Sequence, residues 1–135
     1  MENNNPLLKK KNQEIEAKFP VKDLSGFIAK LKSLGAELVL HDAYEHNILL
    51  DTPERELLKS SARLRLRDEK GKFILTYKQT RKRENNISYR DEIETSVDDI
   101  ENARLIFERL GYEVNFEYEK YRSTYRMQDG LIMLD

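Results

Sequence analysis

The clearest pattern along the chain is a strict alternation of apolar and charged residues, which predicts β-strands. Residues 62–68 (ARLRLRD) alternate in this way, and the alternation resumes over residues 73–78 after a turn at residues 69–72. Two such runs joined by a short turn predict a β-hairpin. Further strands are expected at residues 13–19, 44–51, 88–95, about 114–126 and 131–135.

Two other segments keep their apolar residues three and four positions apart, which predicts helices. The first follows a cap at Asp23 or Ser25 and ends at Gly35, and the second begins near Asp98 or Asp99 and ends at Gly111. Their apolar stripes are Leu24, Phe27, Ile28, Leu31 and Leu34 in the first, and Ile100, Ala103, Phe107 and Leu110 in the second.

Polar stretches separate these elements. Loops are expected around Pro53 and over residues 80–88 (TRKRENNIS), where charged and polar residues dominate. Residues 1–12 are rich in Asn and Lys and are expected to form a mobile N-terminal arm. Residues 13–135 are then one folded domain.

The two helical segments belong to an internal repeat. Gly111 lies 76 positions after Gly35, and the residues around the helix starts match at the same offset. Each helix follows a strand with a Glu-x-Glu pair, Glu14 and Glu16 in the first half and Glu92 and Glu94 in the second. The repeat predicts an α+β fold in which two strand–helix–strands units, about seven strands in all, join into one antiparallel sheet or β-barrel with helices packed outside.

The same repeat predicts that strands are missing from the second half. At an offset of 76, the counterparts of Arg63, Arg65 and Lys78 would lie beyond Asp135. The domain over residues 13–135 is therefore expected to be truncated at its C-terminus.

Composition narrows the class of protein. The chain has 24 Lys and Arg against 25 Asp and Glu, a net charge of -1, so a general nucleic-acid binder is not expected. It contains no cysteine, which excludes thiolate metal sites and a cysteine nucleophile. No apolar run reaches membrane-spanning length and the N-terminus has no hydrophobic signal region, so we expect a cytoplasmic protein without a membrane partner.

Charged side chains gather on one face of each predicted strand, because side chains alternate faces along a strand. These faces carry Glu14, Glu16 and Lys18; Arg63, Arg65 and Arg67; Lys78; Arg90, Glu92 and Glu94; and Lys120, Arg122 and Arg126. Arginines side by side repel one another unless solvent or a polyanion separates them. A surface sheet would leave them solvated, whereas a cupped or closed sheet would aim them into a lumen.

Such a lumen suits a polyphosphate together with a divalent metal ion. Arginine matches phosphate oxygens with its planar fork, and lysine adds a point charge. Paired carboxylates hold Mg²⁺ or Mn²⁺, which bridge phosphate oxygens.

Several of these residues form motifs of a known family. Glu14-Ile15-Glu16-Ala17-Lys18 resembles the ExExK signature strand of the CYTH family, the triphosphate tunnel metalloenzymes. The resemblance continues in order over residues 64–67, 75–78, 90–94, Lys120-x-Arg122 and residues 134–135. The family includes class IV adenylyl cyclases, thiamine triphosphatases and inorganic triphosphatases, and the layout is most similar to the class IV adenylyl cyclase branch.

The resemblance implies an eight-stranded antiparallel tunnel and a role for each motif residue. Glu14, Glu16 and Lys18 would be catalytic. The triphosphate would be bound by Lys18, Arg63, Arg65, Lys78, Lys120 and Arg122. Mg²⁺ or Mn²⁺ would be held by Glu14, Glu16, Glu92, Glu94 and Asp135. The family also has a closing strand with a further Glu-x-Glu pair, which this sequence lacks.

Three functions follow as alternatives. The first is metal-dependent hydrolysis of a triphosphate, whether inorganic tripolyphosphate, thiamine triphosphate or a nucleoside triphosphate such as ATP. The second is a class IV adenylyl cyclase, which makes cyclic AMP from ATP. The third is a non-catalytic module that binds polyphosphate or nucleotide. The sequence allows a homodimer in each case.

Overall fold

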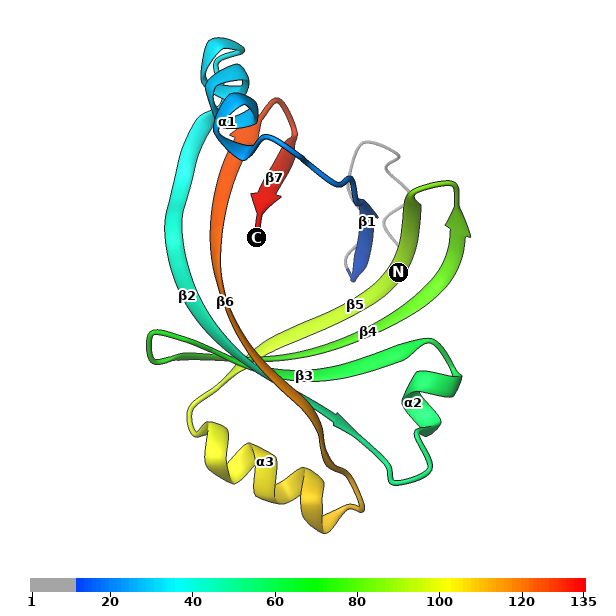
Figure 1. Ribbon diagram of the computed structural model, residues 1–135. Helices are drawn as coiled ribbons and strands as arrows, with labels where there is room; N and C mark the ends of the chain where they lie inside the picture. Colours follow the sequence, from blue (N-terminus) through cyan, green and yellow to red (C-terminus); the bar gives the residue numbers. More distant parts are fainter. Residues whose placement is uncertain (1–11) are drawn as a thin grey trace, which may run out of the picture.

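The computed structural model describes residues 12–135, and all seven strands in this part of the chain join one antiparallel sheet. They are β1 (Gln13–Ala17), β2 (Glu37–Asp51), β3 (Ala62–Glu69), β4 (Lys72–Glu84), β5 (Ile87–Val97), β6 (Glu113–Met127) and β7 (Gly130–Leu134). Their order across the sheet is β1-β5-β4-β3-β2-β6-β7. The sheet curls into a half-barrel whose edges are β1 and β7 (Figure 1). The predicted antiparallel α+β fold is thus confirmed, while the arm predicted over residues 1–12 lies, except for Asn12, outside the described residues.

Three helices accompany the sheet in the described residues: α1 (Leu24–Ser33), α2 (Glu56–Lys59) and α3 (Ile100–Arg109). Helix α3 lies against the outside of the curled sheet, and α1 lies where β2 begins and β6 ends (Figure 1). None of these helices combines the length and the apolar character that crossing a membrane requires.

The hydrophobic core lies between α3 and the convex side of the sheet. Ile48 and Leu50 of β2 and Leu64 and Leu66 of β3 form its centre, and Leu66 is fully buried. Leu57 of α2 and the α3 stripe of Ile100, Ala103 and Phe107 pack against them. Burying each leucine contributes about 1.5–3 kcal/mol. The alternate residues of β3 therefore point to the concave side, which places Arg65 and Arg67 there.

The internal repeat is visible in the structure. Asp23 caps α1 by accepting a hydrogen bond from the Gly26 N–H at 3.0 Å, and Asp99 caps α3 by accepting one from the Asn102 N–H at 2.9 Å. Strands β2 and β6 each have 15 residues and begin 76 positions apart. Gly35 and Gly111 follow the helices with φ of 82° and 100°, a left-handed conformation that glycine adopts without strain.

The prediction of a loop over residues 80–88 was wrong. Strand β4 continues to Glu84 and β5 begins at Ile87, so only a tight turn at residues 85–86 separates them, with Asn85 at φ 54°. This part of the hairpin is held by backbone pairing from Thr80↔Arg90 to Glu84↔Ile87. The sequence gives little sign of it, because both faces of the strand are polar here and no apolar residue alternates with the charges.

The prediction that the counterparts of Arg63 and Arg65 in the second half lie beyond Asp135 was also wrong. Ser123 of β6 pairs with Leu134 of β7, whereas Asn47, 76 positions earlier, pairs with Arg67 of β3. Strand β7 therefore takes the place of β3 in the second half, within the chain. The constant offset fails after β6, because a two-residue turn at residues 128–129 replaces the longer connection through α2.

Helix α2 was not predicted. The carboxylate of Asp51, at the end of β2, accepts hydrogen bonds from the N–H groups of Thr52, Leu57 and Leu58. These bonds satisfy N–H groups at the start of α2 that have no partner within the helix. Four residues are too few for an apolar stripe, so the periodicity contains no signal for this helix.

Candidate functional site

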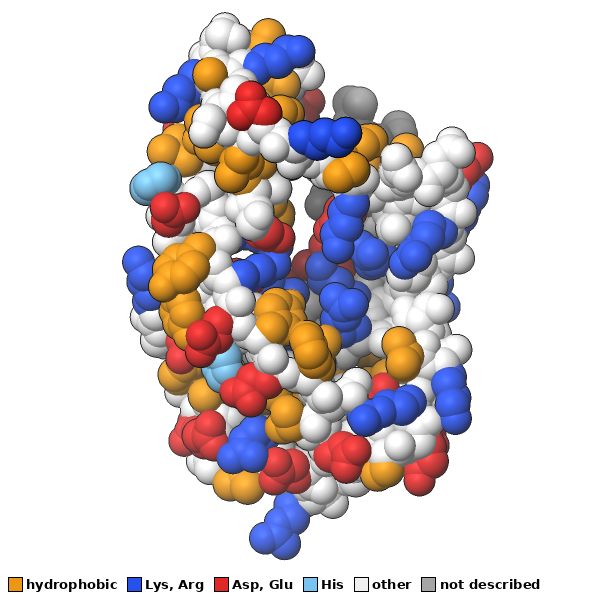
Figure 2. Space-filling model, in the orientation of Figure 1, with side chains coloured by type: hydrophobic (Ala, Val, Ile, Leu, Met, Phe, Trp, Pro, Cys, Tyr) orange, Lys and Arg blue, Asp and Glu red, His pale blue; other side chains and the backbone are white. Residues whose placement is uncertain are grey.

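Charged side chains line the concave side of the half-barrel, and we call this surface the concave charged face. It is formed by Glu14 (β1), Arg90 and Glu92 (β5), Lys78 (β4), Arg65 and Arg67 (β3), Glu45 (β2), Lys120 and Arg122 (β6), and Asp135 after β7. Figure 2 shows basic and acidic groups side by side in the central hollow of the molecule. The interpretation that the strands turn their charged faces inward agrees with this arrangement.

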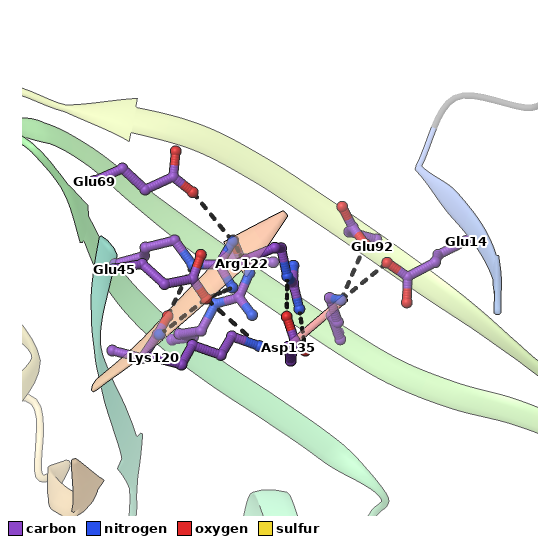
Figure 3. A network of polar contacts seen from close by, with 12 residues as sticks. Glu14, Glu45, Glu69, Glu92, Lys120, Arg122 and Asp135 are labelled. Atoms are coloured by element: carbon purple, nitrogen blue, oxygen red, sulfur yellow. Dashed lines mark hydrogen bonds and ion pairs between the residues drawn. The ribbon is translucent and has the colours of Figure 1, made fainter. Parts of the chain in front are cut away.

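At the β1 edge, two carboxylates share one lysine. Lys78 Nζ lies 2.9 Å from Glu14 Oε2 and 3.5 Å from Glu92 Oε2 (Figure 3). Arg90 Nη1 lies 3.2 Å from Glu14 Oε1 and 3.6 Å from Glu16 Oε1. Register explains the grouping, because Glu14 pairs with Arg90 and Lys78 pairs with Glu92 across neighbouring strands.

Glu14 and Glu92 compete for one proton. The hydrogen bond with Glu14, together with burial, raises the pKa of Glu92 to about 7. Burial alone would raise the pKa of Glu14, but hydrogen bonds from Glu92, Lys78 and Arg90 outweigh burial and lower it. Two close carboxylates share a proton in this way because their negative charges repel.

In the middle of the concave charged face, Glu45 is 4% exposed and forms ion pairs with two basic side chains. Its Oε1 lies 3.2 Å from Arg67 Nη2 and 3.5 Å from Lys120 Nζ. Arg67 also donates from Nε to Asn47 Oδ1 at 2.8 Å and pairs with Glu69. This network joins three adjacent strands, β3, β2 and β6.

At the β7 edge, Asp135 accepts from two basic side chains of β6. Arg122 donates to both of its carboxylate oxygens, at 2.6 and 2.9 Å, and Lys120 Nζ lies 3.0 Å away (Figure 3). The hydrogen bonds from Arg122 lower the pKa of Asp135 to about 2. A two-pronged contact of this kind is the geometry in which arginine also binds a phosphate.

Arg65 differs from the other basic groups of the face. It is 8% exposed, yet it has no ion pair with any carboxylate among residues 12–135. Arg65 donates a long hydrogen bond, 3.5 Å from Nη2 to Thr76 Oγ1, and its Nε has no partner in the described residues. Burial, together with the charge of Arg67, lowers the pKa of Arg65. A buried guanidinium without a counter-ion is costly, so an anion that binds here would relieve that cost.

The structure separates some of the residues that the motifs group together. The Lys18 side chain is 86% exposed and reaches only Glu16, at 3.9 Å, and Arg63 and Glu94 are also exposed. Glu14 and Glu92 lie together, whereas Asp135 pairs with two basic side chains of β6, Lys120 and Arg122. Lys78, Lys120, Arg122 and Arg65 do lie on one face. The roles assigned to all of these residues stay predictions.

Three residues of the face were not among the predicted site residues: Arg67, Arg90 and Glu45. Arg67 and Arg90 were on predicted inward faces, where their partners could not be known. Glu45 had one usable signal, since Glu45 and Asn47 alternate with Tyr44, His46 and Ile48 along the strand. That pattern places a carboxylate and an amide on the same face of the strand.

Glu14 and Glu92 are the residues best placed to hold a metal ion. Buried Glu92 Oε2 has no hydrogen-bond partner in the described residues, and carboxylate oxygens are the donors that Mg²⁺ and Mn²⁺ prefer. No three Asp, Glu or His side chains of residues 12–135 meet as a ready metal cluster. The pair therefore fits an ion that keeps several of its waters, as Mg²⁺ does.

The chain is similar in sequence to a known protein. The chain is 31% identical over 116 residues to a protein of Methanocaldococcus jannaschii named "Putative adenylate cyclase", and this match covers 86% of the chain. The chain spans only 65% of the length of that relative.

Solved structures share the fold. A protein from Pyrococcus horikoshii, 28% identical, superposes with a TM-score of 0.74 over 88% of this chain and 68% of its own. A Hippeastrum protein, 17% identical, superposes with a TM-score of 0.58 over 90% of this chain and 69% of its own. The latter is named a "Putative adenylyl cyclase" with a dominant triphosphatase activity.

The family model for the CYTH domain matches residues 12–135, which include every strand and helix described above. This chain belongs to the CYTH domain family.

Proposed function

We propose that this protein binds a triphosphate on the concave charged face and cleaves it with the help of a divalent metal ion. The observation that carries the proposal is Arg65, a buried guanidinium that lacks a counter-ion in the described residues. Lys78 comes from β4, next to the strand of Arg65, and Lys120 and Arg122 come from β6, which lies beyond β2 on the other side. All three could add their charges to the same anion. A triphosphate carries enough negative charge and enough oxygens to contact several of them at once.

The ion pairs of the face suggest how a triphosphate would be accommodated. Lys120 and Arg122 are held by Asp135, and Lys78 is held by Glu14 and Glu92. Phosphate oxygens would replace these carboxylates as partners of the basic groups. The carboxylates released in this exchange would then need another cation.

Glu14 and Glu92 would take up that cation. When bound, Mg²⁺ or Mn²⁺ would neutralise charge on the phosphate oxygens and orient the attacking oxygen. The protein itself would contribute fixed positive charge, since Arg65 and Arg122 already lie on the concave charged face where we expect the triphosphate to bind. No residue of the face needs to form a covalent intermediate with the substrate.

Hydrolysis is the first candidate reaction, because it requires recognition of the triphosphate alone. Water would then attack the phosphorus atom. Cyclisation of ATP is the second candidate, and the name of the M. jannaschii relative favours it. There the 3′-hydroxyl of ATP, in place of water, would attack the α-phosphorus atom, and pyrophosphate would leave.

The test is to incubate the purified chain with tripolyphosphate or ATP and Mg²⁺ or Mn²⁺, and to identify the products by phosphorus NMR. We expect release of phosphate or pyrophosphate that stops when a chelator is added. Cyclic AMP as the main product from ATP would overturn the hydrolase assignment in favour of the cyclase. Binding without turnover would leave a binding module, and no binding of either compound would contradict the proposal as a whole.

A further inference from the structure

Two aromatic rings continue the concave charged face along β6. Phe116, Tyr118, Lys120 and Arg122 alternate along the strand, and their pairing with β2 is regular from Leu49↔Phe116 to Glu45↔Lys120. All four side chains therefore lie on the same face. The rings of Phe116 and Tyr118 have centroids 5.8 Å apart and are tilted by 32°. Hydrophobic side chains do lie beside the basic groups at the margin of the hollow (Figure 2).

These rings are tied to the anion-binding groups. Lys120 Nζ lies 5.9 Å from the centre of the Tyr118 ring, close enough for a cation–π contact. Burial lowers the pKa of Arg65, whereas the Tyr118 hydroxyl raises this pKa because it favours the charged guanidinium. Tyr118 thus lies between the basic groups and Phe116.

Packing within residues 12–135 does not explain the position of Phe116. It is 57% exposed and belongs to the concave side, whereas the hydrophobic core lies on the convex side. An exposed aromatic ring next to a cluster of basic groups is a favourable surface for a ligand that combines a planar ring with an anionic group.

We propose that Phe116 and Tyr118 stack against the aromatic ring of an organic triphosphate, so that the substrate is a ring-bearing triphosphate rather than inorganic tripolyphosphate. This inference rests on the proposed function, since it requires the triphosphate on the basic groups. Strand geometry places Tyr118 about 7 Å and Phe116 about 13 Å from Lys120 along β6. One ligand can therefore reach both parts of the face, with its phosphates on the basic groups and its ring on the aromatic pair.

The test compares three ligands by isothermal titration calorimetry: ATP, thiamine triphosphate and tripolyphosphate. Phe116→Leu removes the ring, and Phe116→Trp keeps one. Tyr121→Leu is the matched control, because Tyr121 is 63% exposed on the same strand but points to the opposite face.

We expect Phe116→Leu to weaken binding of at least one ring-bearing triphosphate by about 5- to 100-fold, the range for one stacked base. Tripolyphosphate affinity should stay within about twofold, and Phe116→Trp and Tyr121→Leu should bind like the wild type. Whether ATP or thiamine triphosphate loses affinity then identifies the ring.

Two results would overturn the inference and leave the proposed function intact: an equal effect of Phe116→Leu on tripolyphosphate, or no effect on either ring-bearing ligand. Failure of the wild-type protein to bind any of the three would instead overturn both. Circular dichroism of each variant shows that a lost affinity is not lost folding.

Discussion

Strands β3 and β7 occupy the same place in the two halves of this protein, but only β3 carries buried arginines. Each follows a long strand, β2 or β6, and pairs with it in an antiparallel register. The sequence of β3 is ARLRLRDE, with two buried arginines, whereas that of β7 is GLIML. At the matching position of the register, Arg67 in the first half corresponds to Leu134 in the second.

The difference separates what the repeat preserves from what it does not. Helix caps, helix lengths, the glycine after each helix and the lengths of β2 and β6 recur in both halves. The buried charges of the concave face do not recur. The repeat is therefore a repeat of the scaffold, and the proposed binding site is asymmetric within it.

The largest effect is expected when the first half is made like the second at Arg67. Arg67→Leu removes the guanidinium that pairs with Glu45. Glu45 is 4% exposed and then keeps Lys120, at 3.5 Å, as its one basic partner in the described residues. Removing one partner of a buried ion pair costs about 3–5 kcal/mol. We expect the free energy of unfolding, measured by urea denaturation, to fall by that amount.

Two further variants show whether the buried charge is the cause. Glu45→Gln combined with Arg67→Leu should recover part of the loss, because no carboxylate is then buried beside a leucine. Met133→Ala, at an exposed position of β7, should cost less than about 1 kcal/mol. A loss below about 1 kcal/mol for Arg67→Leu would show that β3 does not depend on its charge.

A smaller and pH-dependent effect is expected where β2 ends. Burial alone would raise the pKa of Asp51, but the N–H groups of Leu57, Leu58 and Thr52 outweigh burial and lower it. Because the folded pKa lies below the unfolded one, this stabilisation is present above about pH 4 and is lost as the pH falls toward the folded pKa. Strand β6 ends at Met127, so the second half has no such acid-sensitive group there.

Asp51→Asn tests this prediction. The variant should be less stable than the wild type by about 1–3 kcal/mol at neutral pH, the cost of losing hydrogen bonds to a charged group. The difference should shrink steadily below pH 4 in urea denaturation experiments. A difference that is constant from pH 7 to pH 3 would mean that the charge of Asp51 is not what stabilises α2.

The smallest effects should be equal in the two halves. Asp23→Ala and Asp99→Ala each remove one helix cap with the same geometry, at a cost of about 0.5–2 kcal/mol. The two alanine variants should lose similar amounts of thermal stability if the two helix caps contribute equally to the stability of the protein. Asp23→Asn and Asp99→Asn are the controls, since asparagine also caps a helix. A large difference between the two alanine variants would contradict the equivalence.

Much of the fold could be predicted from sequence because it follows from residue spacing. The alternation in ARLRLRD identifies both the strand and its buried face, and Gly35 and Gly111 mark the helix ends. Spacing fails where both faces of a strand are polar, as over residues 80–84, and where a side chain builds a short helix, as Asp51 does for α2. It also fails when a connection changes length, which is why the equivalence of β7 to β3 was missed, although the strand itself was expected at residues 131–135.

The candidate site was predictable as a set of faces but not as a set of partners. Alternation places Arg65, Lys120 and Arg122 on inward faces. Which carboxylate neutralises which cation depends on strand order, and that order brings Glu45 between Arg67 and Lys120 although they are far apart in sequence. The absence of a counter-ion at Arg65 within residues 12–135 could be seen only in three dimensions.

The most direct test of the concave charged face is the affinity of tripolyphosphate for Arg65→Gln, measured by isothermal titration calorimetry beside the wild type. Arg104→Gln is the matched control, because Arg104 lies on α3 and pairs there with Glu101 and Glu108. Losing a hydrogen-bonded charge contact should weaken binding by about 10- to 100-fold in Arg65→Gln and by less than twofold in Arg104→Gln. Equal affinities of Arg65→Gln and the wild type would contradict the account.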